Sequence, residues 1–260
     1  MKKLPNVTYL TIMGREKPVD KENHELVNRI VKLASNWFEF GSVKLLSAQD
    51  ENQCALNEKI EFVKIDPMKA VDYNKFCVED LHKYVDTEYV ILFQTDGFIL
   101  SGENWDDKFL DYDYIGSPWP FVYGNNKYYR IEDFEAEYPK DCQCHHLCGN
   151  GGFSLRSKKF LELSSKLKYN PQTHIVYYEF NPEDTFLCLD NYEYFIKNGC
   201  KFGEGEIGFK FSCEGDMYTL ENGKLKAIPL HPLASLGFHG VDQTPGALST
   251  LIKRLLYNTK

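Results

Sequence analysis

Asp96 lies where a carboxylate could bind a ligand, because it follows the apolar run EYVILF at residues 88–93. Such a run predicts a strand that is buried on both faces of a parallel sheet. Open α/β sheets bind ligands beyond the carboxyl ends of their strands, and a carboxylate there could hold Mg²⁺ or Mn²⁺ against phosphates. Asp96 followed by Gly97 is also typical of a simple Asx turn, and the pattern leaves both interpretations open.

Glu183 and Asp184 form a second candidate, because they follow Pro182 at the expected start of a helix. The helix macrodipole favours their ionised form, which suits a general base that accepts a proton from a sugar hydroxyl. Acidic residues also begin many helices as simple caps, and that is the commoner role of such a pair.

The turn at residues 149–152 reads GNGG, and glycines allow a backbone to approach a ligand closely. The turn lacks both the Gly-Lys-Ser/Thr of a phosphate loop and the G-x-G-x-x-G spacing of a dinucleotide site. Basic residues follow it at Arg156, Lys158 and Lys159, and these could hold phosphate. His239 lies in the later segment GFHG, where a lone histidine is more often structural than a ligand.

A cluster of soft ligands could bind Zn²⁺. Its five members fall within seven residues and are Cys142, Cys144, His145, His146 and Cys148. The spacing differs from the usual pair of Cys residues with a distant second pair, and one short loop rarely closes a tetrahedron. The sequence therefore favours reduced thiols over a structural zinc site.

The composition is that of a folded soluble protein. The 260 residues fit one large domain or two tightly joined ones, with 43% apolar and 26% charged residues. The net charge of −8 argues against a generic nucleic-acid binder, which needs clustered Lys and Arg. Residues 94–142 hold 11 acids and 4 bases, so most of the net charge lies there. Aromatics reach 15%, and Trp105 and Trp119 could stack on sugar rings or pack in the core.

Residues 1–13 carry two lysines but no apolar stretch long enough for a secretory signal. No run approaches the ~18 apolar residues of a membrane span. We therefore expect a cytoplasmic protein with reduced cysteines. Residues 247–257 place leucines near helical spacing, which predicts a final helix that packs on the body or makes peripheral contact with a membrane surface.

The hydrophobic periodicity predicts an α/β order in the first hundred residues. The expected elements are a strand at 7–13, a helix at 24–37, strands at 42–46 and 60–65, a helix at 73–84 and a strand at 88–93. Residues 101–148 are expected to be rich in loops. The glycine turn then leads into a strand, followed by helices at 158–167 and 181–197.

Five segments, taken in order, resemble the family called domain of unknown function 5672, which is similar to the GT-A glycosyltransferases. They are QTDGFILSGENWDDKFLDYDYIGSPWP (94–120), GNGGFSLRSKKFLE (149–162), NPEDTFLC (181–188), KFGEGEIGFKFSCE (201–214) and GFHG (237–240). The resemblance implies a single Rossmann-like α/β domain with a mixed central sheet. Its nucleotide-binding half would span 1–100 and its donor and acceptor half 101–245, followed by a C-terminal helix at 246–260.

The resemblance also implies roles for individual residues. The donor-binding residues would be Thr11, Gly14, Arg15, Gln94, Thr95, Asp96, Gly97, Gly151 and Gly152. The acceptor-binding residues would be Trp119, Asn150 and Glu183. Asp96 and His239 would hold Mn²⁺ or Mg²⁺, although Gly97 and Phe98 follow Asp96 and the second acid of the D-x-D motif is therefore missing. Asp184, with Glu183 beside it, would act as the catalytic base.

The implied activity is transfer of a sugar from a nucleotide-sugar such as a UDP-sugar to a hydroxyl of a glycan or glycolipid acceptor, as in polysaccharide biosynthesis. Attack assisted by Asp184 would invert the anomeric carbon. The missing second acid suggests one alternative, a catalytically inactive carbohydrate-binding or scaffold module. A nucleotidyltransferase is another, but residues 14–18 (GREKP) only partly match the basic glycine loop that it needs.

Overall fold

The structure of the protein is a computed structural model. It describes residues 1–14, 21–54, 56–124, 127–130, 143–172, 179–214, 217–222, 224–228 and 234–240. Arg15, Cys142 and the helix expected at 246–260 lie outside the described residues.

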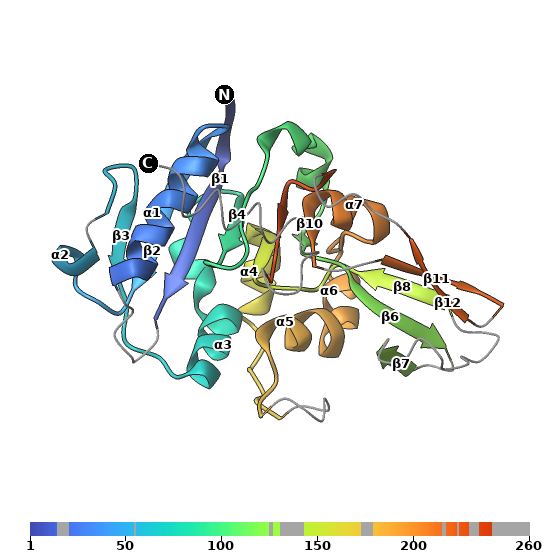
Figure 1. The fold of residues 1–260 in the computed structure, drawn as a ribbon. Coiled ribbons are helices and arrows are strands. Elements are labelled where there is room, and N and C mark those ends of the chain that lie inside the picture. The colour runs from blue at the N-terminus through green and yellow to red at the C-terminus, as the bar shows by residue number, and fades with distance from the viewer. Residues whose placement is uncertain are drawn as a thin grey trace.

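A six-stranded mixed sheet forms the centre of the molecule, in the order β3-β2-β1-β4-β9-β5 (Figure 1). Its strands are β1 (Lys2–Met13), β2 (Phe38–Ser47), β3 (Glu61–Lys64), β4 (Tyr89–Phe93), β5 (Tyr114–Ile115) and β9 (Phe153–Ser157). Strands β1 to β4 run parallel, whereas β9 is antiparallel to both β4 and β5. The α/β class and the mixed central sheet are therefore confirmed, and the wholly parallel surroundings expected for β4 are wrong on its β9 side.

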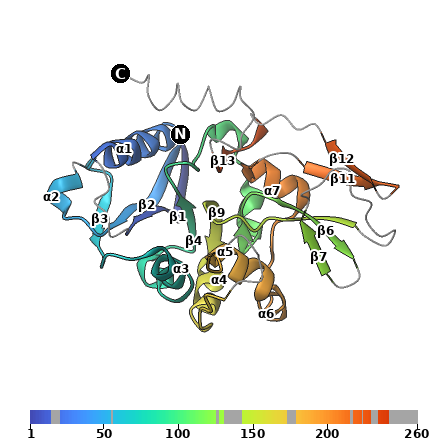
Figure 2. The same ribbon diagram turned by 60° about the horizontal axis from the view of Figure 1, so that its bottom comes forward.

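Helices cover both faces of this sheet, which explains why the central strands β1 and β4 are buried along most of their length. Figure 2 shows α1 (Lys21–Ser35) on one face and α3 (Ala70–Glu79) on the other. In β1, Tyr9 packs into the cluster that contains α1, whereas Leu10 joins the cluster on the opposite face. The short helices α2 (Glu51–Cys54) and η1 (Leu81–Tyr84) complete this half.

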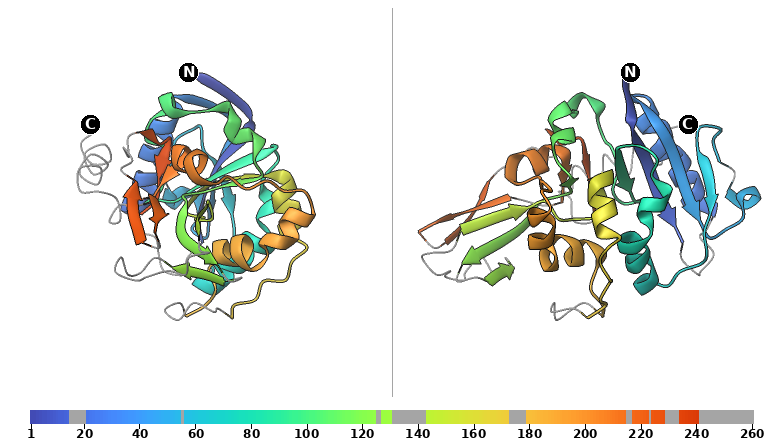
Figure 3. Two further views of the ribbon diagram at one scale, coloured as in Figure 1. Left: turned by 90° about the vertical axis from the view of Figure 1, so that its right-hand side faces the viewer. Right: turned by 180° about the vertical axis from the view of Figure 1, so that it is seen from behind.

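The second half holds more strands than expected. Strands β6 (Trp119–Gly124), β7 (Lys127–Arg130) and β8 (Gln143–Leu147) form an antiparallel sheet, and β11 (Met217–Glu221) pairs with β12 (Lys224–Ile228). Figure 3 shows these strands extending away from β1 to β3. The expectation of loops over 101–148 is therefore wrong. Strands β6 and β7 read WPFVYG and KYYR, and such aromatic and β-branched residues favour strands.

The remaining elements surround the sheet ends. They are η2 (Gly102–Asn104), η3 (Asp107–Asp111), α4 (Lys158–Ser164), α5 (Glu183–Thr185), η4 (Phe186–Asp190), α6 (Tyr192–Lys197) and α7 (Gly205–Phe211). The single helix expected at 181–197 is split, because η4 is a π-helical turn that ends where Asn191 bonds the Phe186 carbonyl. Such turns are frequent near functional sites.

Two very short strands close the described fold, β10 (Ser212–Cys213) and β13 (Gly237–Phe238). They pair in parallel, and this pairing brings Glu214 beside His239. Among the described residues, no helix is both long and apolar enough to cross a membrane.

Candidate active site

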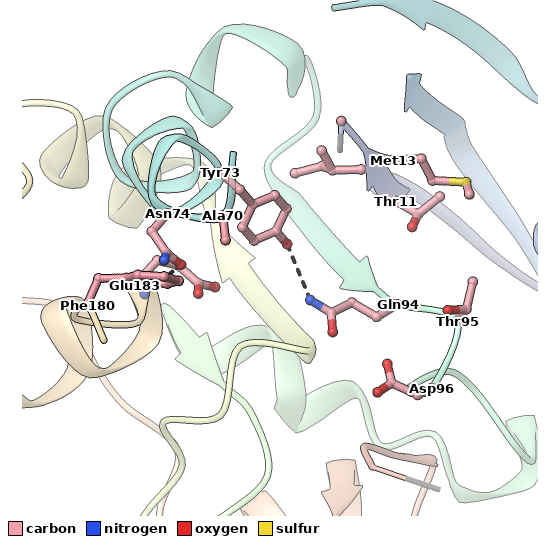
Figure 4. Close-up of a pocket in the computed structure, with 12 residues that line it drawn as sticks. Thr11, Met13, Ala70, Tyr73, Asn74, Gln94, Thr95, Asp96, Phe180 and Glu183 are labelled. Atoms are coloured by element: carbon pink, nitrogen blue, oxygen red, sulfur yellow. Dashed lines mark hydrogen bonds between the residues drawn. The ribbon is translucent and has the colours of Figure 1, made fainter. Parts of the chain in front are cut away.

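A pocket of about 630 Å³ opens at the carboxyl ends of β1 and β4 (Figure 4). Its lining residues are Thr11, Ile12, Met13, Gly14, Ala70, Tyr73, Asn74, Gln94, Thr95, Asp96, Phe180 and Glu183. Six of the residues singled out by the sequence therefore meet here, namely Thr11, Gly14, Gln94, Thr95, Asp96 and Glu183. They come from three separate regions of the chain.

The end of β1 offers backbone polar groups to this pocket. Strand β4 pairs with β1 only as far as Leu10 and Leu92, whereas β2 stays paired to β1 through Met13. In the described part of the chain, no strand therefore covers the β4 side of residues 11–13. The carbonyl of Gly14 accepts a hydrogen bond from the Met68 N–H at 2.6 Å, which anchors the end of the strand.

A tight turn after β4 presents Thr95 and Asp96 at the pocket. Gln94 and Gly97 exchange two backbone hydrogen bonds, and the Gln94 amide donates to the Tyr73 hydroxyl at 3.3 Å. Figure 4 shows this pair between Asp96 on one side and Glu183 on the other. A Cβ at Gly97 would lie 2.8 Å from the His239 ring, so this glycine permits contact with the His239 segment.

Asp184 is held by backbone amides. Its Oδ2 accepts from the Gly151 N–H at 3.0 Å and its Oδ1 from the Thr185 N–H at 2.7 Å. Burial, followed by the charge of Glu183, raises the pKa of Asp184 to about 7, and the two amides and Arg156 oppose this rise. A carboxyl group with a pKa near neutrality is suited to act as a general base.

Glu183 has different surroundings. It is buried, and its Oε1 accepts from Arg156 Nη2 at 3.0 Å, while its own N–H donates to Asn74. The two adjacent acids are therefore distinguished by their partners, a buried guanidinium for Glu183 and backbone amides for Asp184. The phosphate-holding role considered for Arg156 is wrong, because its side chain is fully buried. Lys158 and Lys159 are exposed.

Glu214 is a site residue that the sequence analysis missed. His239 Nδ1 lies 3.1 Å from Glu214 Oε1, and Asn150 Nδ2 donates to Glu214 Oε2 at 2.6 Å. The Oδ1 of Asn150 in turn accepts from the Gly152 N–H at 2.9 Å. The segment KFSCE, which belongs to the family resemblance, ends on Glu214 and was the available signal.

The titration of His239 reflects these neighbours. Burial disfavours the charged imidazolium, but the hydrogen bond and charge of Glu214, with further help from Asp96 and Asp184, outweigh it and raise the pKa of His239. Because Glu214 engages Nδ1, Nε2 remains for another partner. A Cβ at Gly152 would lie 2.0 Å from that Nε2, so the ring rests directly on the glycine turn.

Asp96 and His239 are the residues expected to hold a divalent cation. The Gly240 N–H donates to the Asp96 carbonyl at 2.9 Å, which ties the two segments together. In the described part of the chain, no three His, Cys, Asp or Glu side chains gather as a complete ligand set. Mg²⁺ commonly uses one or two carboxylates together with substrate phosphates and water, so a partial protein ligand set is suited to that arrangement.

Trp105 and Trp119, which could stack on sugar rings or pack in the core, are not among the residues that line the pocket. Trp119 packs against Gly149, where a Cβ would lie 2.2 Å from its ring, and it contacts the buried cluster around Phe160. Trp105 packs on Phe38 and Phe109 at centroid distances of 5.4 and 5.6 Å. Trp105 is therefore a partly buried side chain that packs against the core, and the acceptor-binding roles of Trp119 and Asn150 stay predictions.

The cysteine cluster is only partly visible. Cys148 is buried, and none of the six cysteines whose side chains are described takes part in a disulfide. The side chains of Cys142, Cys144, His145 and His146 lie outside what the structure describes.

Three solved structures match this chain at low sequence identity. A glycosyltransferase involved in glycosylation of the major capsid of PBCV-1 is 12% identical, with 95% of this chain and 98% of that chain covered and a TM-score of 0.45. The bifunctional IspDF of Campylobacter jejuni is 14% identical over 77% of this chain, with a TM-score of 0.44. The match spans 50% of the IspDF chain. The 2-C-methyl-D-erythritol 4-phosphate cytidylyltransferase of Francisella tularensis is 10% identical, with 61% and 76% covered and a TM-score of 0.37.

No curated protein matches the chain. Residues 59–230 match a protein family whose description is "Protein of unknown function (DUF5672)". This region contains β4, the glycine turn, Glu183, Asp184 and Glu214, and it covers well over half of the sequence. The resemblance noted in the sequence is thereby confirmed, and the chain belongs to the DUF5672 family.

Proposed function

We infer that this protein is a transferase acting on a nucleotide-linked sugar, and more specifically an inverting glycosyltransferase with a hydroxyl acceptor. The observation that carries the proposal is Asp184, a carboxyl group whose pKa is raised to about 7 and which two backbone amides orient. Its neighbour Glu183 lines the same pocket as Asp96, so the residue next to the candidate base and a candidate phosphate-side ligand share one cavity.

The donor would occupy the 630 Å³ pocket. Its nucleoside would lie along the uncovered backbone of residues 11–14 and beside Tyr73, and its diphosphate would approach Asp96 and His239. The charged residues that line the pocket are Asp96 and Glu183, and no Lys or Arg is among its described lining residues. An anionic diphosphate placed there would be repelled unless a cation accompanied it. Bound Mn²⁺ or Mg²⁺ would offset the charge that grows on the leaving diphosphate.

The acceptor would approach from the side of Asp184. A hydroxyl is a weak nucleophile until a base removes its proton, and a positioned carboxylate can do this in the transition state. The Oδ2 of Asp184 accepts one amide hydrogen bond and retains a further lone pair, whereas Oδ1 accepts from both the N–H and, at 3.5 Å, the hydroxyl of Thr185. The remaining oxygen of Glu183 can accept from a sugar hydroxyl, since Arg156 bonds only Oε1.

The glycan or glycolipid nature of the acceptor and a UDP-sugar as donor are part of the same proposal and rest on the resemblance. A second candidate is a carbohydrate-binding module without catalysis. Phe98 favours it, because this buried side chain stands where the metal motif of the fold has its second acid.

A thermal-shift panel of nucleotide-sugars, with and without Mn²⁺, tests the proposal. A ligand at 100 times its Kd stabilises the native state by about 2.7 kcal/mol, so a true donor should stand out. The expected result is one nucleotide-sugar class that stabilises the protein only with Mn²⁺, followed by slow release of the nucleotide. Binding without any nucleotide release would favour the inactive module. A panel without a hit would contradict the proposal.

A further inference from the structure

Arg156 is a buried cation in the middle of β9. Its side chain has an exposed fraction of 0%, and it heads the fully buried side chains of the described residues by volume. Its Nη1 is buried and has no hydrogen-bond partner among the described residues. Buried ion pairs are weak sources of stability, and apolar residues of similar volume often serve stability equally well. Stability alone therefore does not explain why a cation is buried at this position.

The contacts of Arg156 tie α5 to the glycine turn. Nη2 donates to Glu183 Oε1 at 3.0 Å and to the Gly151 carbonyl at 3.5 Å. Nε donates to Ser154 Oγ at 3.1 Å, and that hydroxyl donates to the same Gly151 carbonyl at 3.1 Å. The guanidinium also lies 5.3 Å from the centre of the Tyr114 ring.

Gly151 lies at the centre of these groups. A Cβ on this residue would lie 2.4 Å from Glu183 Oε1, 3.0 Å from Arg156 Nη2 and 3.1 Å from the Asp184 Cβ. The N–H of the same glycine donates to Asp184 Oδ2. Arg156 therefore holds the peptide that follows Gly151, while the peptide that precedes Gly151 holds Asp184.

We propose that Arg156 is the positioning residue of the Glu183–Asp184 pair. Its planar guanidinium fixes the Glu183 carboxylate and the Gly151 carbonyl in one orientation, and this keeps Asp184 against the Gly151 amide. The catalytic reading of this inference rests on the proposed function. Lysine is no substitute, because a single ammonium lacks the rigid fork that spans two acceptors.

The test compares R156K and R156M with K166M, which removes an exposed cation outside the site. Three quantities are measured: hydrogen exchange of the Gly151 amide, the Kd of the donor and kcat. Both Arg156 variants should speed Gly151 exchange at least ~10-fold and lower kcat at least ~100-fold, the lower end of the range for a lost general base. The donor Kd should stay within ~3-fold, and K166M should match the wild type.

A folded R156K with wild-type Gly151 exchange would overturn the inference, as would one with wild-type kcat. If both Arg156 variants fail to fold, G151A perturbs the same contacts and leaves the buried cation in place, and wild-type kcat in G151A would overturn the inference. A wild type that turns over no donor would contradict the proposed function instead. The hydrogen-exchange rate of the Gly151 amide in the Arg156 variants would still test the positioning role of Arg156, because it does not depend on activity.

Discussion

Gly151 donates its backbone N–H to the Asp184 carboxylate across 3.0 Å, which joins the glycine turn to the start of α5. The other side of the same turn faces the histidine segment, because Gly152 donates to Asn150 and Asn150 donates to Glu214. One four-residue turn thus contacts both the candidate base and the group that holds His239. A displacement of this turn should disturb both at once.

The first prediction concerns pH. A base must be deprotonated to accept a proton, so kcat/KM should rise with pH and level off above the pKa of Asp184, about 7. Asp184 interacts electrostatically with six charged or titratable groups, which are Glu183, Arg156, Cys77, Tyr114, Cys188 and His239. Nucleotide release measured from pH 5 to 9 checks the profile. A rate that is flat across this range, or highest in acid, would contradict the role of Asp184.

Glu214 should control the affinity for Mn²⁺. E214Q removes the carboxylate that engages His239 Nδ1, and loss of such an outer partner typically weakens metal binding about 10–100-fold. Mn²⁺ titration followed by electron paramagnetic resonance, in the presence of the donor nucleotide, measures this. The matched control is E206Q, because Glu206 is an exposed carboxylate paired with Lys210. Equal Mn²⁺ affinity in E214Q and wild type would contradict a role of Glu214 in metal binding.

A side chain at position 152 should displace the His239 ring. In G152A the new Cβ would lie 2.0 Å from His239 Nε2, so the ring must move. Donor binding should then lose its dependence on Mn²⁺ to the same extent as in H239A. Calorimetric titration of donor with and without Mn²⁺ compares the two variants. Unchanged Mn²⁺ dependence in G152A would show that the ring position does not matter.

Breaking the buried ion pair should destabilise the fold. R156M leaves the buried Glu183 carboxylate without its cation, which costs about 3–5 kcal/mol for a pair of this kind. The double variant R156M/E183M removes both charges and should recover most of that loss. Urea unfolding of the three proteins measures the differences. A double variant as unstable as R156M would mean that volume and shape, rather than charge, set the cost.

The first half of the fold could be predicted because its signals are local. The expected strand at 7–13 and helix at 24–37 correspond to Lys2–Met13 and Lys21–Ser35. Periodicity within one segment sets these elements. Strand β8 was not predicted, because it pairs with β6 across a long intervening segment. The hairpin of β6 and β7 had a local aromatic signal, which the acidic residues around it obscured.

The residues of the candidate site also fall into two groups, those with a local sequence signal and those without one. Asp96 and Asp184 could be identified from a strand end and a helix start, which are local features. The segment KFSCE offered a signal for Glu214, but the contacts of Glu214 and the burial of Arg156 could not be predicted, because the tertiary fold makes them. Arg156 meets a partner 27 residues away, and Asn150 reaches Glu214 across 64 residues.

The most direct test of the central claim is the rate of nucleotide release from the selected nucleotide-sugar by D184N. The amide cannot accept the acceptor's proton as a carboxylate does, so the account predicts a rate about 10²–10⁴-fold below that of the wild type. Donor affinity should change little, because Asp184 is not among the residues that line the pocket. A D184N protein that binds donor and turns it over within threefold of the wild-type rate would contradict the account.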